Sequence, residues 1–112
     1  MDATPPVVAP LRELPVTLDP ALASREAELQ IIPLLYDTLF QISAEGRPRP
    51  HLIEAGPEVS ADGRTWRLRL RPGVRLSSGR LLTATDVAAS LRRARKGPQG
   101  YLLAPLQTVE VE

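Results

Sequence analysis

The clearest hydrophobic pattern in the chain is a strict alternation over residues 65–71. Apolar residues fall on one side of this stretch, at Trp66, Leu68 and Leu70, and polar residues, mostly arginine, fall on the other. A period of two predicts a half-buried strand with one face in the core and one in water. The dipeptides Asp62-Gly63 and Pro72-Gly73 are turn signals on either side of it. Alternation then resumes over 74–76, which predicts a short neighbouring strand.

Two helices are predicted by the other apolar spacings. Thr83 and Asp86 have the form of a capping box, so a helix is expected from Ala84 to about Arg95, with Val87, Leu91 and Ala94 buried. An earlier helix is expected to begin at a Ser24 cap and run to about residue 39, with Ile32, Leu35, Tyr36 and Leu39 facing inward. Pro33 lies inside that pattern, and we expect a kink or a restart there.

The alternation Thr108-Val109-Glu110-Val111-Glu112 predicts a further strand near the end of the sequence. The chain is therefore expected to be an α+β unit: a small antiparallel sheet built from 65–71, 74–76 and 109–111, with two main helices packed on one face. Prolines at positions 5, 6, 10 and 15 break any periodicity before this unit. We accordingly divide the chain into a Pro-rich segment, residues 1–16, and a domain, residues 17–112.

Composition limits the range of functions. The chain has 112 residues, 43% of them hydrophobic, and a net charge of +1, so neither nucleic acid nor a membrane surface is an expected partner on charge alone. A basic cluster at Arg92, Arg93, Arg95 and Lys96 is interpreted as a solvated helix end that complements the helix dipole, with a nucleic-acid patch as the alternative. Cysteine is absent, which excludes disulfides and thiolate metal sites.

No arrangement of residues in the sequence indicates catalysis. The chain has no nucleophile elbow, no phosphate loop, no zinc-protease motif and no paired carboxylates in an apolar setting. His51 is the only histidine, and a metal site needs several converging ligands. Glu26 and Glu28 are interpreted as exposed complements of a helix dipole. The expectation is a protein that is not an enzyme and holds no metal or cofactor.

The same stretch of turns, strands and capped helix resembles the N-terminal lobe of the family 5 extracellular solute-binding proteins. That family shows a segment of the form S-x-D-G-x-T, then L-R-x-G-V, then G, then T-A-x-D-V. Upstream, Leu18-Asp19-Pro20 and Leu35-Tyr36-Asp37-Thr38-Leu39 resemble two further family elements, so the resemblance covers roughly Thr17 to Val111. The matching residues of the main segment are Pro50, Leu52, Val59, Ser60, Asp62, Gly63, Thr65, Leu70, Arg71, Gly73, Val74, Gly79, Thr83, Ala84, Asp86 and Val87.

This resemblance implies a binding role. Family members are two-lobed receptors of ABC importers that take peptides, dipeptides or nickel, are several times longer than this chain, and deliver their ligand to a membrane permease. The chain would then be an N-terminal fragment with an incomplete ligand site, periplasmic or extracellular, in a parent with or without a lipid anchor. By the resemblance, the candidate ligand-binding residues are Ser24, Arg25, Glu26 and Tyr101.

Alternatives remain open for these residues and for the function. Arg25 and Glu26 also suit a charged first helical turn, and Tyr101 also suits core packing. The chain could instead be a ligand-sensing domain of a transcriptional regulator with the same fold, or a fragment that binds no ligand and self-associates through uncovered apolar surface and sheet edges.

Overall fold

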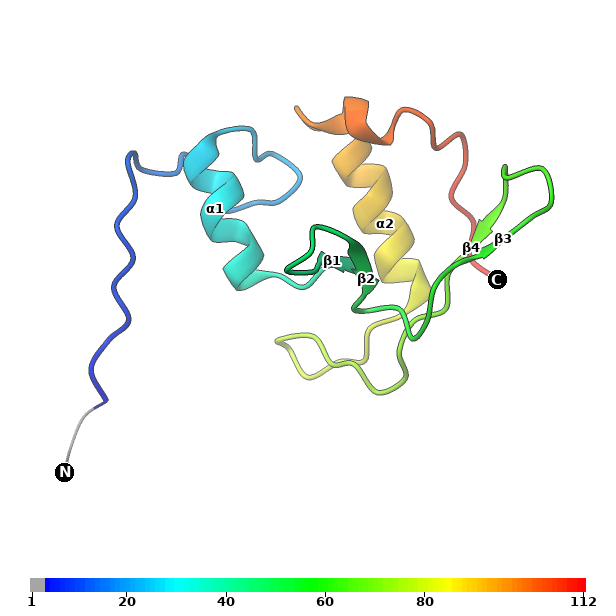
Figure 1. The fold of residues 1–112 in the computed structure, drawn as a ribbon, viewed down its shortest axis with the longest axis horizontal. Coiled ribbons are helices and arrows are strands. Elements are labelled where there is room, and N and C mark those ends of the chain that lie inside the picture. The colour runs from blue at the N-terminus through cyan, green and yellow to red at the C-terminus, as the bar shows by residue number, and fades with distance from the viewer. Residues whose placement is uncertain (1–3) are drawn as a thin grey trace.

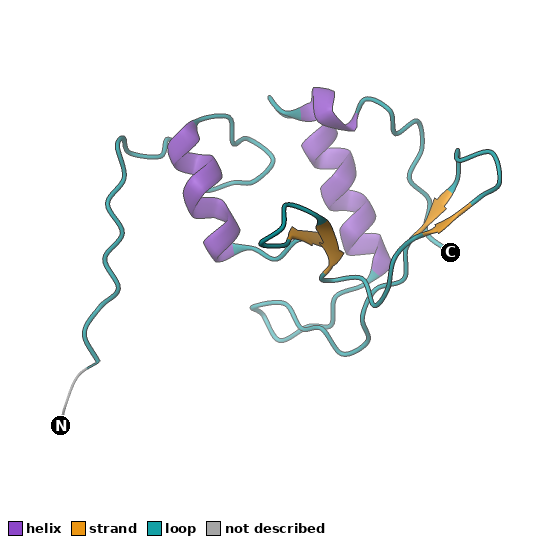
Figure 2. Cartoon of the chain, viewed as in Figure 1, coloured by secondary structure: helices purple, strands orange, loops and turns teal. Residues whose placement is uncertain are grey.

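The structure is a computed structural model that describes residues 4–112; residues 1–3 of the predicted Pro-rich segment lie outside the described residues. Over these described residues, two α-helices, two small antiparallel sheets and a short 3₁₀ helix make up the fold (Figures 1 and 2), which confirms the α+β class. The elements follow in the order α1 (Glu26–Leu35), β1 (Phe40–Ile42), β2 (Pro48–Pro50), β3 (Glu58–Val59), β4 (Trp66–Arg67), α2 (Ala84–Arg95) and η1 (Gly100–Leu103).

Helix α1 is shorter than its pattern predicts. Its N-cap is Arg25 rather than Ser24, and it ends at Leu35, where Tyr36 turns to extended backbone. Pro33 lies within the helix without a restart, and the helix stops two residues later. Of the four residues expected to face inward only Ile32 is buried, whereas Leu35 is 57% exposed, because the chain leaves the helix before the predicted face is complete.

The first sheet is a hairpin of β1 and β2. Phe40 pairs with Pro50 and Ile42 with Pro48, around a turn in which Gly46 takes a positive φ of 77° that suits glycine. Proline cannot donate to a ladder, so its two places in β2 suit a sheet of only two strands. This hairpin connects α1 to the rest of the chain.

The second sheet pairs β3 with β4 and is much shorter than predicted. The ladder covers only Trp66 and Arg67, and an isolated bridge joins Leu70 to Ile53. Ile53 is fully buried, but Trp66 is 61% exposed, so the apolar face of the strand is not a core face. The Trp66 ring nitrogen instead donates to the carbonyl of Gly63 in the preceding turn, at 3.0 Å.

The other two predicted strands differ from expectation for identifiable reasons. Residues 74–76 turn back on residues 80–82 through a bridge from Arg75 to Leu81, because the Ser77-Ser78-Gly79 turn is tight enough to close a hairpin of its own. Residues 109–111 are extended but form no ladder within residues 4–112. The expected single sheet is therefore replaced by two separate two-stranded sheets.

Helix α2 matches its prediction closely. It spans Ala84–Arg95, and Thr83 and Asp86 form the expected capping box. The Asp86 carboxylate accepts from the Thr83 N–H at 2.9 Å and receives both terminal nitrogens of Arg80 at 3.0 Å. Ala88 is the buried residue of this helix, while the residues expected inside, Val87, Leu91 and Ala94, are only half-buried.

The core is small for the length of the chain. It consists of short side chains from the 21–27 region and α2 together with two isoleucines: Ala21, Ala23, Ala27, Ile32, Ile53 and Ala88. The accessible surface is 9304 Å², against about 6,000 Å² for a compact monomer of this mass. The N-terminal segment, drawn in dark blue, runs away from the body of the molecule (Figure 1), which accounts for part of the excess.

Candidate functional site

The candidate site is built around the start of α1, where the buried carboxylate of Glu28 gathers backbone N–H groups. Its two oxygens accept from Ser24 and Arg25 at 3.0 and 3.1 Å, and from Val16 and Thr17 at 2.9 and 3.0 Å. The first pair are donors at the helix N-terminus that would otherwise lack partners. The second pair belong to the chain arriving at the site, so one side chain joins both segments.

Glu28 is 1% exposed and ionised. The N–H groups of Ser24, Arg25, Thr17 and Val16 stabilise the negative charge and lower the pKa of the Glu28 carboxyl to about 2, against the opposing effect of burial. The interpretation of Glu28 as an exposed dipole complement is therefore wrong. It is the buried anchor of the site.

The turn before α1 is held by a second carboxylate, Asp19. Its side chain accepts from the Ala21 N–H at 3.0 Å and forms a two-pronged ion pair with Arg93 of α2. The Arg93 guanidinium, followed by the Ala21 N–H, lowers the pKa of the Asp19 carboxyl. These partners are 74 positions apart in the sequence, so the ion pair fixes the site to the C-terminal half of the chain.

The same turn touches the residues that follow α2. A Cβ placed on Gly97 would lie 1.8 Å from the carbonyl oxygen of Ala21, a separation that no side chain allows. Only glycine permits this approach, so the backbone beyond α2 lies directly against the turn. The contact and the Asp19–Arg93 ion pair together form one junction between the turn and the end of α2.

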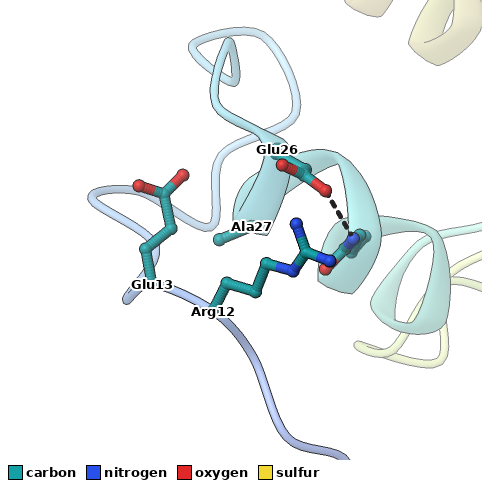
Figure 3. Close-up of a pocket in the computed structure, with 5 residues that line it drawn as sticks. Arg12, Glu13, Glu26 and Ala27 are labelled. Atoms are coloured by element: carbon teal, nitrogen blue, oxygen red, sulfur yellow. Dashed lines mark hydrogen bonds between the residues drawn. The ribbon is translucent and has the colours of Figure 1, made fainter.

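On this base the predicted ligand residues Ser24, Arg25 and Glu26, which are consecutive in the sequence, are exposed where the chain enters α1. Glu26 also lines a hollow of about 210 Å³, and accepts from the Gln30 amide at 3.2 Å. Figure 3 shows Arg12 extending from the N-terminal segment across this first turn. The hollow is lined by Arg12, Glu13, Glu26, Ala27 and Gln30.

Tyr101 lies elsewhere, on η1 beyond the end of α2. Tyr101 is 68% exposed, so it does not pack into the core formed by residues 4–112. Tyr101 does not line the hollow beside Glu26. The structure thus brings Ser24, Arg25 and Glu26 together and places Tyr101 apart from them, with its ring open to solvent.

The basic residues at the end of α2 bind other parts of the chain. Arg92 donates to the Val109 carbonyl, Arg93 pairs with Asp19, and Arg95 donates to the Gln107 carbonyl at 3.2 Å. Through these bonds the arginines hold the turn before α1 and the C-terminal segment against α2. They favour a structural role over a patch that neutralises phosphates.

His51 lies in a loop and is half-buried. Its ring nitrogen is 3.2 Å from an Asp37 oxygen, in a contact at the surface. Within residues 4–112, no three metal-ligating side chains converge. Among the same residues, neither helix is long and apolar enough to cross a membrane.

Sequence reasoning missed three residues that shape the site: Glu28, Arg93 and Arg12. A signal existed for Glu28, because a Glu three residues after the N-cap is half of a capping box. With the cap assigned to Ser24 instead of Arg25, Glu28 did not fall at that position. The pairing of Arg93 with Asp19 has no local signal. Arg12 reaches the site from a segment whose prolines predict only an extended chain.

Comparison with known proteins places these features in a family. The family model described as "Bacterial extracellular solute-binding proteins, family 5 Middle" matches residues 47–112, which is more than half of the chain. The candidate residues of the first α1 turn precede this match, whereas Tyr101 falls inside it. No solved structure gives a significant match.

Three curated relatives align with part of the chain. It is 37% identical over 70 residues to a probable peptide ABC transporter periplasmic-binding protein of Sinorhizobium fredii, covering 62% of this chain and 13% of the relative. It is 33% identical over 72 residues to the oligopeptide-binding protein OppA of Bacillus subtilis, covering 64% and 13%. It is 32% identical over 80 residues to the HTH-type transcriptional regulator SgrR of Photorhabdus laumondii, covering 70% and 14%.

The chain therefore aligns with about one seventh of the length of these relatives. The family match nevertheless spans the β3–β4 hairpin, the capped helix α2 and η1 in a single run. The chain belongs to family 5 of the bacterial extracellular solute-binding proteins.

Proposed function

We propose that the protein carrying this chain is the substrate-binding component of an ABC importer for peptides or related small solutes. The match to the family 5 model carries the proposal. Two of the relatives support it, since their names describe a peptide transporter binding protein and an oligopeptide-binding protein. The role is binding without catalysis, in the periplasm or outside the cell, with a membrane permease as the receiving partner.

The proposed ligand contacts are Ser24, Arg25 and Glu26, with Tyr101 as a separate contact. The exposed guanidinium of Arg25 and carboxylate of Glu26 are neighbours, and they suit the carboxylate and ammonium groups that a peptide carries. Glu28 accepts a hydrogen bond from the Arg25 backbone, and the Asp19–Arg93 ion pair holds the preceding turn against α2. A preorganised contact of this kind loses less entropy when a ligand binds.

We also propose that residues 17–112 belong to the ligand-binding lobe and residues 1–16 to a separate segment. The bond from the Thr17 N–H to Glu28 supports a lobe that begins near this point. Before it, residues 4–15 contain no helix or strand.

The test is a thermal unfolding assay of the complete product of the gene that carries this sequence, against di- to oligopeptides and nickel complexes. A ligand that binds only the folded state raises the midpoint by mass action, by about 2.7 kcal/mol of stability at a hundredfold excess over Kd. We expect a peptide to raise it, and Arg25→Ala to reduce the rise. Arg47→Ala, an exposed arginine of the β1–β2 hairpin, is the matched control.

A second candidate function is ligand sensing in a transcriptional regulator. It is favoured by the regulator relative, whose alignment covers a larger share of this chain than those of the other two relatives. The two functions differ in what else the complete gene product does. A mobility-shift assay on its own upstream DNA and sequencing of its mature N-terminus separate them: DNA binding favours the regulator, and removal of an export signal favours the importer.

A further inference from the structure

One edge of the strand that carries β4 lacks a backbone partner. On its inner side, Thr65, Arg69 and Arg71 bond to residues 60, 54 and 52. In an antiparallel pair the backbone groups of alternate residues point to opposite edges, so those of Trp66 and Leu68 point outward. No described residue supplies a ladder bond to that outer edge.

This edge also presents apolar side chains to solvent. Trp66 is 61% and Leu68 36% exposed, and they lie on the same face of the strand. An open edge flanked by exposed apolar residues is a template for pairing with another extended chain. Such an edge is open to pairing with another strand, and its charge pattern indicates which strand would fit.

The opposite face of this strand is basic, with Arg67, Arg69 and Arg71 at alternate positions. Two such edges from different copies would place arginines against arginines, and like charges directly opposite are destabilising. Residues 108–112 have the complementary pattern, in which valine alternates with glutamate. If residues 108–112 paired with the 65–71 strand, their valines would lie beside its leucine or tryptophan side chains, and their glutamates beside its arginines.

The contact between these two segments within one copy is made by side chains alone. Glu112 receives two nitrogens of Arg67 at 2.9 and 3.0 Å. The carbonyls of Gln107 and Val109 accept hydrogen bonds from Arg95 and Arg92 of α2. Figure 1 shows this segment ending beside β4, so it is already held near the edge that it would complete.

We propose that two copies of this chain associate by exchanging residues 108–112, each segment pairing along the open 65–71 edge of the other copy. The exchange is reciprocal, as a two-fold dimer requires. The proposal does not depend on the ligand-binding function.

The first experiment is sedimentation velocity of the chain over a wide concentration range. We expect a monomer–dimer equilibrium. Charge reversal on the edge, Arg67→Glu with Arg69→Glu, is expected to raise the dimer Kd by tenfold or more, since several cross-strand ion pairs turn repulsive. Reversal on the segment, Glu110→Arg with Glu112→Arg, is expected to do the same. A strictly monomeric chain at high concentration overturns the proposal.

Mixing the two variants provides the decisive measurement. Each alone repels its own kind, but in an exchanged heterodimer every reversed edge meets a reversed segment, so equimolar mixing restores the dimer. This recovery also shows that both variants fold. If the mixture stays monomeric, while circular dichroism shows both variants helical, the segments do not exchange between copies.

A matched control excludes attraction between oppositely charged proteins in general. Arg47→Glu with Arg49→Glu changes the net charge as the edge variant does, but on the β1–β2 hairpin. Alone it should dimerise like the parent chain. Mixed with the segment variant, it should associate no more than it does alone, and association equal to that of the edge mixture contradicts a specific strand exchange.

Discussion

At the scale of single residues, Gly97 shows how strictly backbone contact limits substitution. Its α-carbon lies against the Ala21 carbonyl, which a Cβ would approach to 1.8 Å. Gly97→Ala must push the chain after α2 away from the turn before α1. Overpacking of this kind costs about 1–3 kcal/mol, and we expect a loss of that size in the free energy of unfolding by urea.

Gly56→Ala is the control for that prediction. Nothing lies within 4 Å of a Cβ at Gly56, and its φ is not positive. Its effect should stay within about 0.5 kcal/mol, as for an ordinary surface change. Equal losses for the two substitutions would mean that the close approach is not what makes Gly97 necessary.

Glu28→Gln tests the buried anchor. An amide has one acceptor oxygen where the carboxylate has two, so its NH₂ group would face backbone N–H groups that need an acceptor. We expect a clear fall in the thermal midpoint. Glu26→Gln, two residues earlier and exposed, should leave the midpoint nearly unchanged, and equal effects would contradict the role given to Glu28.

At the scale of elements, α2 begins where its cap places it. Thr83 accepts from the Asp86 N–H at 3.3 Å while the Asp86 carboxylate accepts from Thr83. Thr83→Ala should lower the free energy of unfolding by about 1 kcal/mol. Thr85→Ala, two residues later with an exposed side chain, should cost much less, and a cost as large as that of Thr83→Ala would show that the cap is not the cause.

The ion pair between the turn and α2 is tested by a double-mutant cycle. Asp19→Asn and Arg93→Met should each lower stability, and the double variant should lose less than the two losses added together. Strict additivity would show that the two groups are not coupled. Raising the salt concentration should weaken the coupling, since both groups are partly exposed.

The elements differ in how far the sequence predicts them. The start of helix α2 at Ala84 and its end near Arg95 are predicted correctly, because its signals, a capping box and a helical period, lie within the helix and its cap. The predicted sheet was wrong in extent because pairing depends on which strand lies opposite, and alternation does not identify a partner. The β3–β4 ladder is two residues long although the alternation covers seven.

The candidate site was predictable only in part for a similar reason. Ser24, Arg25 and Glu26 are proposed through the resemblance of the preceding turn to the family, and these consecutive residues are exposed where the chain enters α1. Their supports were not predicted. Arg93 and Gly97 come from the other half of the chain, and only the folded backbone shows that they reach Asp19 and Ala21.

At the scale of the whole molecule, two carboxylates make stability depend on acid. Hydrogen bonds lower the pKa values of Glu28 and Asp86 to about 2, whereas in an unfolded chain such groups titrate near pH 4. Both stabilise the fold fully above the unfolded pKa, and this contribution disappears as the pH falls toward 2. Thermal midpoints should therefore decline between about pH 5 and pH 2, and should decline less steeply in Glu28→Gln.

The bonds from Val16 and Thr17 to Glu28 also mark where the backbone becomes protected from proteolysis. Residues 4–15 have no helix or strand, and Arg12 within them is exposed, so trypsin can cut after Arg12 in the folded protein. The first residues whose N–H groups are bound by Glu28 follow four positions later. Brief digestion should therefore remove the N-terminal segment. The remaining fragment should keep the helical content of the intact chain and resist further cleavage.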